Sequence, residues 1–225
     1  MQRMSETALR IASARGVPGT ACALVADDAG RRLLLANHHV VFGGGAAPGD
    51  PVWAIPPGCD DDCRRDAVRL GAVGCGYLGR ITFGRDMCFV DCATVALAGE
   101  VRFPAWLAKQ IDNAVAPESA GAQTGMPVFK TGVTTGRTEG QLVDVAYPDH
   151  PFVEGRWRSA PGQLLVDSRT VGMNFAAPGD SGAPLVDERG RIVGMLWGSN
   201  ANGQGIACPI APVLNCLRVS LGGRR

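Results

Sequence analysis

Short runs of alternating apolar and polar residues, separated by glycine-containing turns, make up most of the chain. Residues 19–41 have the pattern of a strand, an Asp-Gly turn and a second strand, and the same arrangement recurs at 163–171 and 183–210. A period of two residues predicts β-strands, and Asp-Glu-Arg-Gly at 187–190 and Asn-Gly at 202–203 predict hairpin turns. The pattern therefore predicts an all-β protein built as a barrel or sandwich.

Three segments have a helical pattern instead. They are residues 1–15, residues 104–116, and residues 209–219, which open with a proline near the first turn. The middle helix and the polar stretch 116–125 divide the chain into two β-rich halves. We expect an N-terminal helical extension at 1–16, a first β-unit at 17–110, and a second β-unit at 111–225 that ends in a C-terminal helix.

The composition excludes several classes of protein. The 225 residues are 46% hydrophobic and 19% charged, which is typical of a folded domain with a sizeable core. Twenty-two basic residues nearly balance 21 acidic ones, so no net field attracts nucleic acid or an acidic membrane. The N-terminus lacks the apolar stretch of a secretory signal, and no run of eighteen apolar residues follows. We expect a cytoplasmic protein that binds neither membranes nor nucleic acid.

Eight cysteines give an even count, but their density is far below that of a disulfide scaffold. Five of them lie between positions 59 and 92, and their spacing is not the Cys-x-x-Cys pairing of common zinc modules. We therefore expect free thiols and neither a metal nor a cofactor. A zinc site in this cluster is the less favoured alternative.

The segment Gly-Asp-Ser-Gly-Ala-Pro at 179–184 raises the possibility of a nucleophile at Ser181, although the same residues also form ordinary β-turns. A serine hydroxyl attacks an acyl carbon only when a base lies within hydrogen-bond reach and a third group orients that base. The chain has three histidines, His38, His39 and His150. Alternation along the strand leaves His38 and His39 equally possible, because neighbouring side chains point to opposite faces.

Residues 36–41 (ANHHVV), 90–97 (VDCATVAL) and 178–186 (PGDSGAPLV) together resemble the trypsin-like, chymotrypsin-clan serine peptidases. The likeness runs from about Gly19 to Leu214 and implies two six-stranded antiparallel β-barrels with the site between them. It also implies a catalytic triad of His39 as base, Asp91 as orienting carboxylate and Ser181 as nucleophile.

Two details follow from the same resemblance. Asp86 is the weaker candidate for the orienting carboxylate, because no Asp-x-Ala stretch begins there. The backbone amides of Gly179 and Ser181 would form the oxyanion hole, since a glycine lets the backbone approach the substrate.

A second stretch, residues 129–145, matches a Lys-x-Gly-x-Thr-Thr-Gly-x-Thr-x-Gly pattern that is typical of bacterial trypsin-like peptidases. In that setting the matching residues would shape a strand and a tight turn and take no part in proton transfer. They are Lys130, Gly132, Thr134, Thr135, Gly136 and Gly140.

The resemblance also implies a substrate pocket with Phe175 at its floor and Leu196, Trp197 and Gly198 along its wall. Because Phe175 carries no charge, a preference for lysine or arginine lacks its counter-ion. A small or apolar side chain at the cleavage point is the expected preference.

The chain departs from the family at two points. Val40 stands where many secreted members have a bridged cysteine, and the N-terminus is not the Ile-Val-Gly-Gly type that pairs with the aspartate before the serine. Asp180 must therefore have a different partner or face solvent.

The expected function is a serine endopeptidase that acts on polypeptides through an acyl-enzyme, without a cofactor. Two alternatives remain open: a catalytically silent module that binds peptides in the same cleft, and an esterase or acyltransferase with the same triad. The sequence does not predict the oligomeric state.

Overall fold

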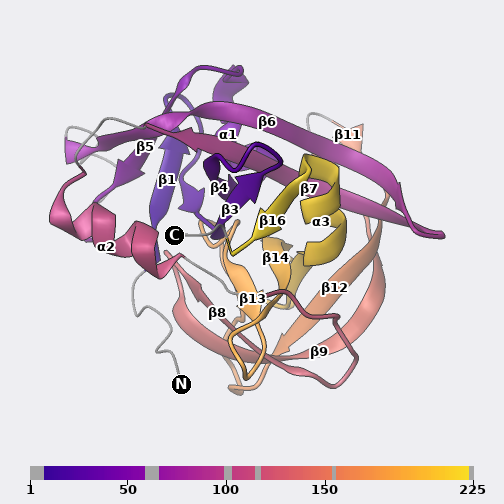
Figure 1. The fold of residues 1–225 in the computed structure, drawn as a ribbon. Helices are drawn as coiled ribbons and strands as arrows, with labels where there is room; N and C mark the ends of the chain where they lie inside the picture. Colours follow the sequence, from indigo (N-terminus) through magenta and orange to yellow (C-terminus); the bar gives the residue numbers. More distant parts are fainter. Residues whose placement is uncertain (1–7, 59–65, 99–102, 115–117, 154–155, 223–225) are drawn as a thin grey trace.

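The computed structural model describes residues 8–58, 66–98, 103–114, 118–153 and 156–222. Figure 1 shows two β-rich units, one built from the N-terminal half of the chain and the other from most of the C-terminal half.

The strands of the first half are β1 (Arg10–Ser13), β2 (Gly19–Thr20), β3 (Ala23–Asp27), β4 (Arg32–Ala36), β5 (Pro51–Ile55), β6 (Val68–Phe83) and β7 (Asp86–Leu97). The later strands are β8 (Pro127–Gly132), β9 (Gly136–Asp149), β10 (Phe152–Val153), β11 (Arg156–Trp157), β12 (Ala160–Ser168), β13 (Pro184–Val186), β14 (Ile192–Ser199), β15 (Gly205–Pro209) and β16 (Val219–Leu221). The helical segments are α1 (His38–Val41), the 3-10 turn η1 (Gly43–Gly45), α2 (Ala105–Asn113) and α3 (Ile210–Leu217).

The second unit is a closed six-stranded barrel with the strand order β12-β15-β14-β13-β8-β9. Each strand of this barrel pairs antiparallel with both of its neighbours. Its interior is filled by apolar side chains such as Val128, Leu142, Leu164 and Phe175, all of them almost fully buried. The prediction of an all-β fold with a six-stranded second barrel is confirmed.

The first unit is an eight-stranded sheet with the order β16-β3-β4-β7-β6-β5-β1-β2. This differs from the six-stranded barrel that we expected, and one reason is the C-terminus. Helix α3 buries Ile210 and Val213 in the cluster between the two units, and the chain then returns so that Val219–Leu221 pairs with β3. The last strand thus belongs to the first sheet, although our division of the chain put it in the second unit.

The predicted N-terminal helix is wrong for Arg10–Ser13, which form β1, while residues 1–7 lie outside the described part of the chain. Strand β1 pairs with both β2 and β5, and Ile11 is fully buried. Tertiary pairing overrides the local helical pattern here. The other two predicted helices are confirmed as α2 and α3.

The apolar cluster that contains Ile210 and Val213 joins the two units. Phe89 of β7 packs against Trp197 of β14 with ring centroids 5.5 Å apart. Gln163 of β12 completes the contact, because its amide donates to the Phe89 carbonyl over 2.9 Å and its carbonyl accepts the Trp197 indole N–H over 2.7 Å. The two units are therefore joined by a packed, hydrogen-bonded seam.

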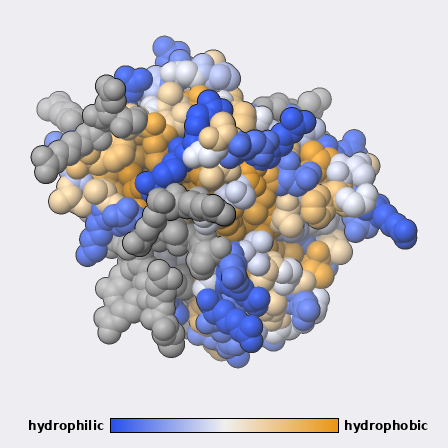
Figure 2. Space-filling view, viewed as in Figure 1, coloured by the Kyte–Doolittle hydropathy of each residue, from blue (hydrophilic) through white to orange (hydrophobic). Residues whose placement is uncertain are grey.

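Within the described residues, no helix combines the length and the apolar character needed to cross a bilayer. Hydrophilic residues are distributed across the face drawn in Figure 2, with hydrophobic ones between them.

Candidate active site

His39 is carried by the single helical turn α1, which begins directly after β4. Strand β4 pairs with β7 so that Ala36 lies opposite Ala93, and this register brings the following turn beside Asp91. Asn37, which is fully buried, strengthens the junction by donating its side-chain amide to the Asp91 carbonyl over 2.8 Å. The structure therefore positions the two residues by sheet register and a buried amide.

The imidazole of His39 and the carboxylate of Asp91 form a direct hydrogen bond. The His39 Nδ1 to Asp91 Oδ2 distance is 2.5 Å, and the His39 backbone N–H donates to Asp91 Oδ1 over 3.2 Å. Asp91 is only 2% exposed, whereas the imidazole is 36% exposed. Because the carboxylate accepts the proton on Nδ1, Nε2 of neutral His39 is left as the basic nitrogen.

Two opposing effects act on the pKa of His39. Burial alone would lower the pKa, because it penalises the charged imidazolium, but the charge of Asp91 and the hydrogen bond to it stabilise that form. The attraction outweighs burial, so the pKa of His39 is raised above its ordinary value of 6.5.

Ser181 lies on a tight turn between barrel strands. Gly179 and Gly182 flank it, both with φ of +98°, a conformation that side chains with a Cβ rarely adopt. A Cβ on Gly182 would lie 1.7 Å from the Thr20 carbonyl oxygen, so no larger residue fits. The Thr20 N–H donates to the Ser181 carbonyl over 2.7 Å, which ties this turn to the first sheet.

The turns that carry His39 and Ser181 converge at Gly19. A Cβ placed on Gly19 would lie 2.5 Å from a methyl of Val40, the residue after His39, and 3.0 Å from the Ser181 carbonyl. The hydroxyl of Ser181 donates to the Trp197 carbonyl over 3.2 Å. Since a hydroxyl has one proton, it does not donate to the imidazole in this rotamer.

Asp180, the residue before the serine, has a buried cationic partner. Lys130 Nζ lies 3.2 Å from Asp180 Oδ2, and both side chains are fully buried. Lys130 Nζ also donates to the Thr135 hydroxyl, which in turn donates to Asp180 Oδ2 over 2.7 Å. Burial lowers the pKa of Lys130, and the neighbouring Asp180 charge only partly offsets this.

Lys130 is therefore the cationic partner of Asp180. The sequence pattern predicts only a strand and a tight turn at 130–140 and assigns no charge partner to Lys130. A lysine within an apolar strand is the signal that could have predicted this pair, because a buried cation is costly without a counter-ion.

The predicted pocket residues lie in different environments. Phe175 is fully buried, and both it and Leu196 pack inside the second barrel. The Trp197 side chain packs into the seam, while its carbonyl accepts the Ser181 hydroxyl. Only beside Gly198, among these four residues, does the structure indicate open space, since a Cβ there would meet no atom within 4 Å. The assignment of the four to a substrate pocket stays a prediction.

The alternative acid–base residues have other surroundings. His38 stacks on Phe42 with ring centroids 4.4 Å apart, and His150 is exposed in the segment after β9. Asp86 is exposed beside the turn between β6 and β7. Among all the acid–base candidates from the sequence, His39 and Asp91 are the pair that the structure brings into contact.

The cysteines of the described ranges are unbridged. They are Cys22, Cys75, Cys88, Cys92, Cys208 and Cys216. Cys59 and Cys63 lie outside the described residues. Among the residues with described positions, no group of three or more ligand side chains has the geometry of a metal site.

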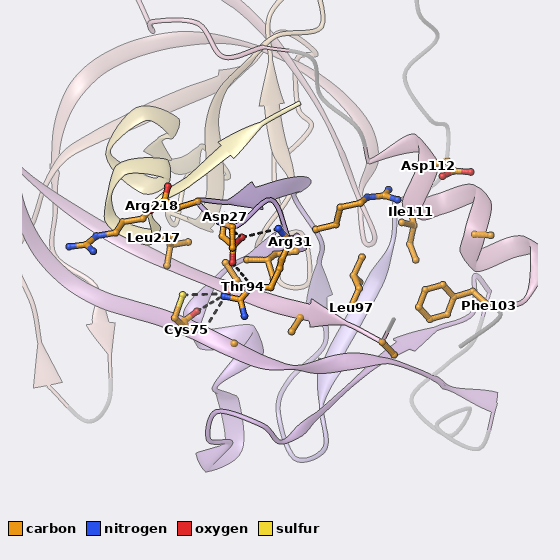
Figure 3. Close-up of a pocket in the computed structure, with 18 residues that line it drawn as sticks. Asp27, Arg31, Cys75, Thr94, Leu97, Phe103, Ile111, Asp112, Leu217 and Arg218 are labelled. Carbon is orange, nitrogen blue, oxygen red and sulfur yellow. Dashed lines mark hydrogen bonds and ion pairs between the residues drawn. The ribbon is translucent and has the colours of Figure 1, made fainter. Parts of the chain in front are cut away.

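A cavity of about 1030 Å³ lies on the first unit, between its sheet, α2 and the end of α3. Figure 3 shows Leu217 at one end and Phe103 and Ile111 at the other, with the Asp27–Arg31 ion pair between them. The candidate triad, by which we mean His39, Asp91 and Ser181, contributes no residue to its lining. The cavity is thus distinct from the site at the seam.

Solved structures resemble the chain over nearly its whole length. A glutamic acid-specific serine protease matches with a TM-score of 0.62 and 17% identity, covering 95% of this chain and 97% of the other. Protease A of Thermobifida fusca matches with a TM-score of 0.60 and 18% identity, covering 94% and 95%. The chain has the chymotrypsin-like serine protease fold.

Other comparisons agree with this fold. The chymotrypsin of Cellulomonas bogoriensis matches with a TM-score of 0.54 and 18% identity, covering 91% of each chain. Residues 153–221 match the model of the equine arteritis virus serine endopeptidase S32 family. A comparison with curated protein sequences found no match. The chymotrypsin-like fold that we expected is therefore confirmed.

Proposed function

We propose that the protein is a serine endopeptidase whose nucleophile is Ser181. The observation that carries the proposal is the 2.5 Å contact between His39 and the buried Asp91, next to a serine turn that is hydrogen-bonded to the same sheet. A base, its orienting carboxylate and a hydroxyl are the parts that acyl transfer requires. The match to a viral serine endopeptidase family over residues 153–221 supports the same reaction.

The first chemical step is attack of the Ser181 oxygen on a peptide carbonyl carbon. The hydroxyl first rotates away from the Trp197 carbonyl and gives its proton to Nε2 of His39 as the new C–O bond forms. Asp91 keeps the imidazole oriented and stabilises its positive charge. The amides of Gly179 and Ser181 donate to the developing oxyanion.

The intermediate then collapses, and the imidazolium returns the proton to the leaving amine as the C–N bond breaks. This leaves an acyl-enzyme on Ser181. Water attacks the ester in the second half, with His39 as base again, and releases the carboxylic acid. Every proton in this scheme passes through side chains of the chain itself, so the steps require no cofactor.

Substrate preference is proposed from the environment of Phe175. Its side chain is fully buried and uncharged, so it offers no counter-ion for a lysine or arginine side chain. We expect cleavage after small or apolar residues, with the peptide lying as an extended strand along Gly198. A mixture of peptides with varied residues at the cleavage point tests this, and preferential cleavage after arginine would contradict it.

A peptide-binding module without turnover is the second candidate. One observation favours it, namely that the Ser181 hydroxyl donates to the Trp197 carbonyl and is not poised on the base. A fluorophosphonate probe separates the two, because it phosphonylates only an activated serine. Stoichiometric labelling of wild type but not of Ser181→Ala supports the enzyme. If native wild-type protein stays unlabelled, the binding module is the better account.

An esterase with the same triad would also react with the probe. Comparing hydrolysis of a matched peptide and ester resolves this third possibility. Cleavage of the ester alone would contradict peptidase activity.

A further inference from the structure

Two threonine hydroxyls contact the backbone on either side of Gly179, one of the two proposed oxyanion donors. Thr134, in the turn between β8 and β9, donates its Oγ1 hydrogen to the Pro178 carbonyl over 2.7 Å. Thr20, from β2, donates its Oγ1 hydrogen to the Gly179 carbonyl over 3.0 Å. Each of the two peptide groups that meet at Gly179 is therefore held by one hydroxyl.

The contact of Thr134 determines where the Gly179 amide points. The Pro178 carbonyl and the Gly179 N–H belong to one peptide group, which is planar and trans, so they point in opposite directions. A hydroxyl that holds the carbonyl on one side therefore holds the N–H on the other. Rotation of this peptide would withdraw the N–H from the oxyanion and break the bond to Thr134.

Gly179 has particular need of such restraints. Without a Cβ, a glycine reaches many backbone conformations, and its neighbouring peptide groups rotate more freely than those of other residues. Its φ is +98°, and a Cβ at this position would lie 2.4 Å from the Thr134 oxygen. The close approach of Thr134 thus requires glycine, and glycine in turn leaves the peptide to be fixed by hydrogen bonds.

The Thr20 hydroxyl is itself held in place. It accepts the Val133 N–H over 3.2 Å, and the residue is only 1% exposed. The same residue donates its backbone N–H to the Ser181 carbonyl. Thr20 therefore connects the first sheet, the β8–β9 turn and the serine turn.

We propose that Thr134 and Thr20 are positioning residues that keep the Gly179 amide aimed at the oxyanion. The inference rests on the proposed function, because it assigns a purpose to a hydrogen-bond donor of that site. Neither residue touches the reacting atoms. Their hydroxyls preorganise the donor, so that the peptide does not have to reorient during the reaction.

The decisive variant is Thr134→Val, which keeps the shape of the side chain and removes the hydroxyl. Loss of an entire oxyanion donor lowers kcat by about 100-fold to 1000-fold. Because this variant keeps the donor and loses only its restraint, we expect kcat and the rate of fluorophosphonate labelling to fall by about 10-fold to 100-fold. KM and the thermal midpoint should stay close to wild type, since Thr134 is exposed.

Two further variants serve as controls. Thr134→Ser retains the hydroxyl and should restore most of the lost rate. Thr82→Val makes the same chemical change at an exposed threonine near the end of β6 and should leave the rate unchanged. Thr20→Val should lower kcat as well, but it also leaves the Val133 N–H without its hydroxyl partner, so its thermal midpoint must be measured alongside.

The outcomes separate this inference from the proposed function. Wild-type protein that the probe does not label refutes the peptidase proposal. If wild type reacts and Thr134→Val reacts equally fast, or only KM changes, the positioning role is refuted. A crystal structure of Thr134→Val gives a readout independent of activity: we expect a rotated or disordered Pro178–Gly179 peptide, and an unchanged peptide would overturn the inference.

Discussion

Replacement of Lys130 by methionine tests whether its ion pair with Asp180 supports the serine turn. Methionine has a similar length and no charge, so the substitution removes the cation without opening a large cavity. Asp180 would remain fully buried, with its Thr134 and Thr135 amide contacts at 2.9 and 3.2 Å but without the neighbouring positive charge.

The expected loss of stability is large. Removing one partner of a buried pair leaves an uncompensated charge and typically costs about 3–5 kcal/mol. For a chain of this length, about 2–4 °C of thermal midpoint correspond to each kcal/mol, so the midpoint should fall by about 6–20 °C at pH 7. Arg169→Met is the matched control, because Arg169 pairs with Glu139 at 2.7 Å on the surface, where both are about half exposed. It should cost less than about 1 kcal/mol.

Thermal and chemical unfolding measure the loss of stability, and fluorophosphonate labelling measures the reactivity of Ser181 in the same samples. We expect labelling of Lys130→Met to be slower even where the protein is fully folded. A thermal midpoint within 2 °C of wild type, roughly the shift for less than 1 kcal/mol, would refute the reasoning.

Three other predictions follow from the geometry. Because the pKa of His39 is raised above 6.5, kcat/KM should fall as the pH drops below that raised value. In Asp91→Asn this fall should occur at lower pH, and the maximal kcat/KM should be reduced by about 10⁴-fold. A pH profile that falls at the same pH as that of wild type would contradict the pairing of His39 with Asp91. The hydrogen bond from Cys92 lowers the pKa of Cys216 below its ordinary value of 9.0, so the alkylation rate, followed by mass spectrometry, should have a midpoint below pH 9, and a midpoint at or above 9 would contradict it. Gly182→Ala should lower the free energy of unfolding by about 2–5 kcal/mol, because the added Cβ would overlap the Thr20 carbonyl oxygen. A denaturant titration measures this loss, and a loss below about 1 kcal/mol would argue against that packing.

The fold class could be predicted from the sequence because the signals for it are local. Alternation and turn residues identify the strands, and three short motifs in the order histidine, aspartate, serine carry the resemblance. The contact between His39 and Asp91 follows from the pairing of β4 with β7, which fixes neighbours on adjacent strands.

What the sequence did not reveal depends on long-range contacts. Residues 10–13 have no local strand signal that outweighs a helical pattern, and they become a strand because β5 and β2 pair with them. The return of β16 to the first sheet and the pairing of Lys130 with Asp180 likewise join segments far apart in the chain. The sequence contains these residues but does not state which segments meet.

The central claim is that His39 and Ser181 act together in one reaction. The most direct test is the hydrolysis rate of an internally quenched peptide by wild type, Ser181→Ala, His39→Ala and the double variant. Because the two residues would take part in the same proton transfer, each single variant should lose nearly as much activity as the double variant. Losses that multiply in the double variant, or wild-type protein without turnover, would contradict the account.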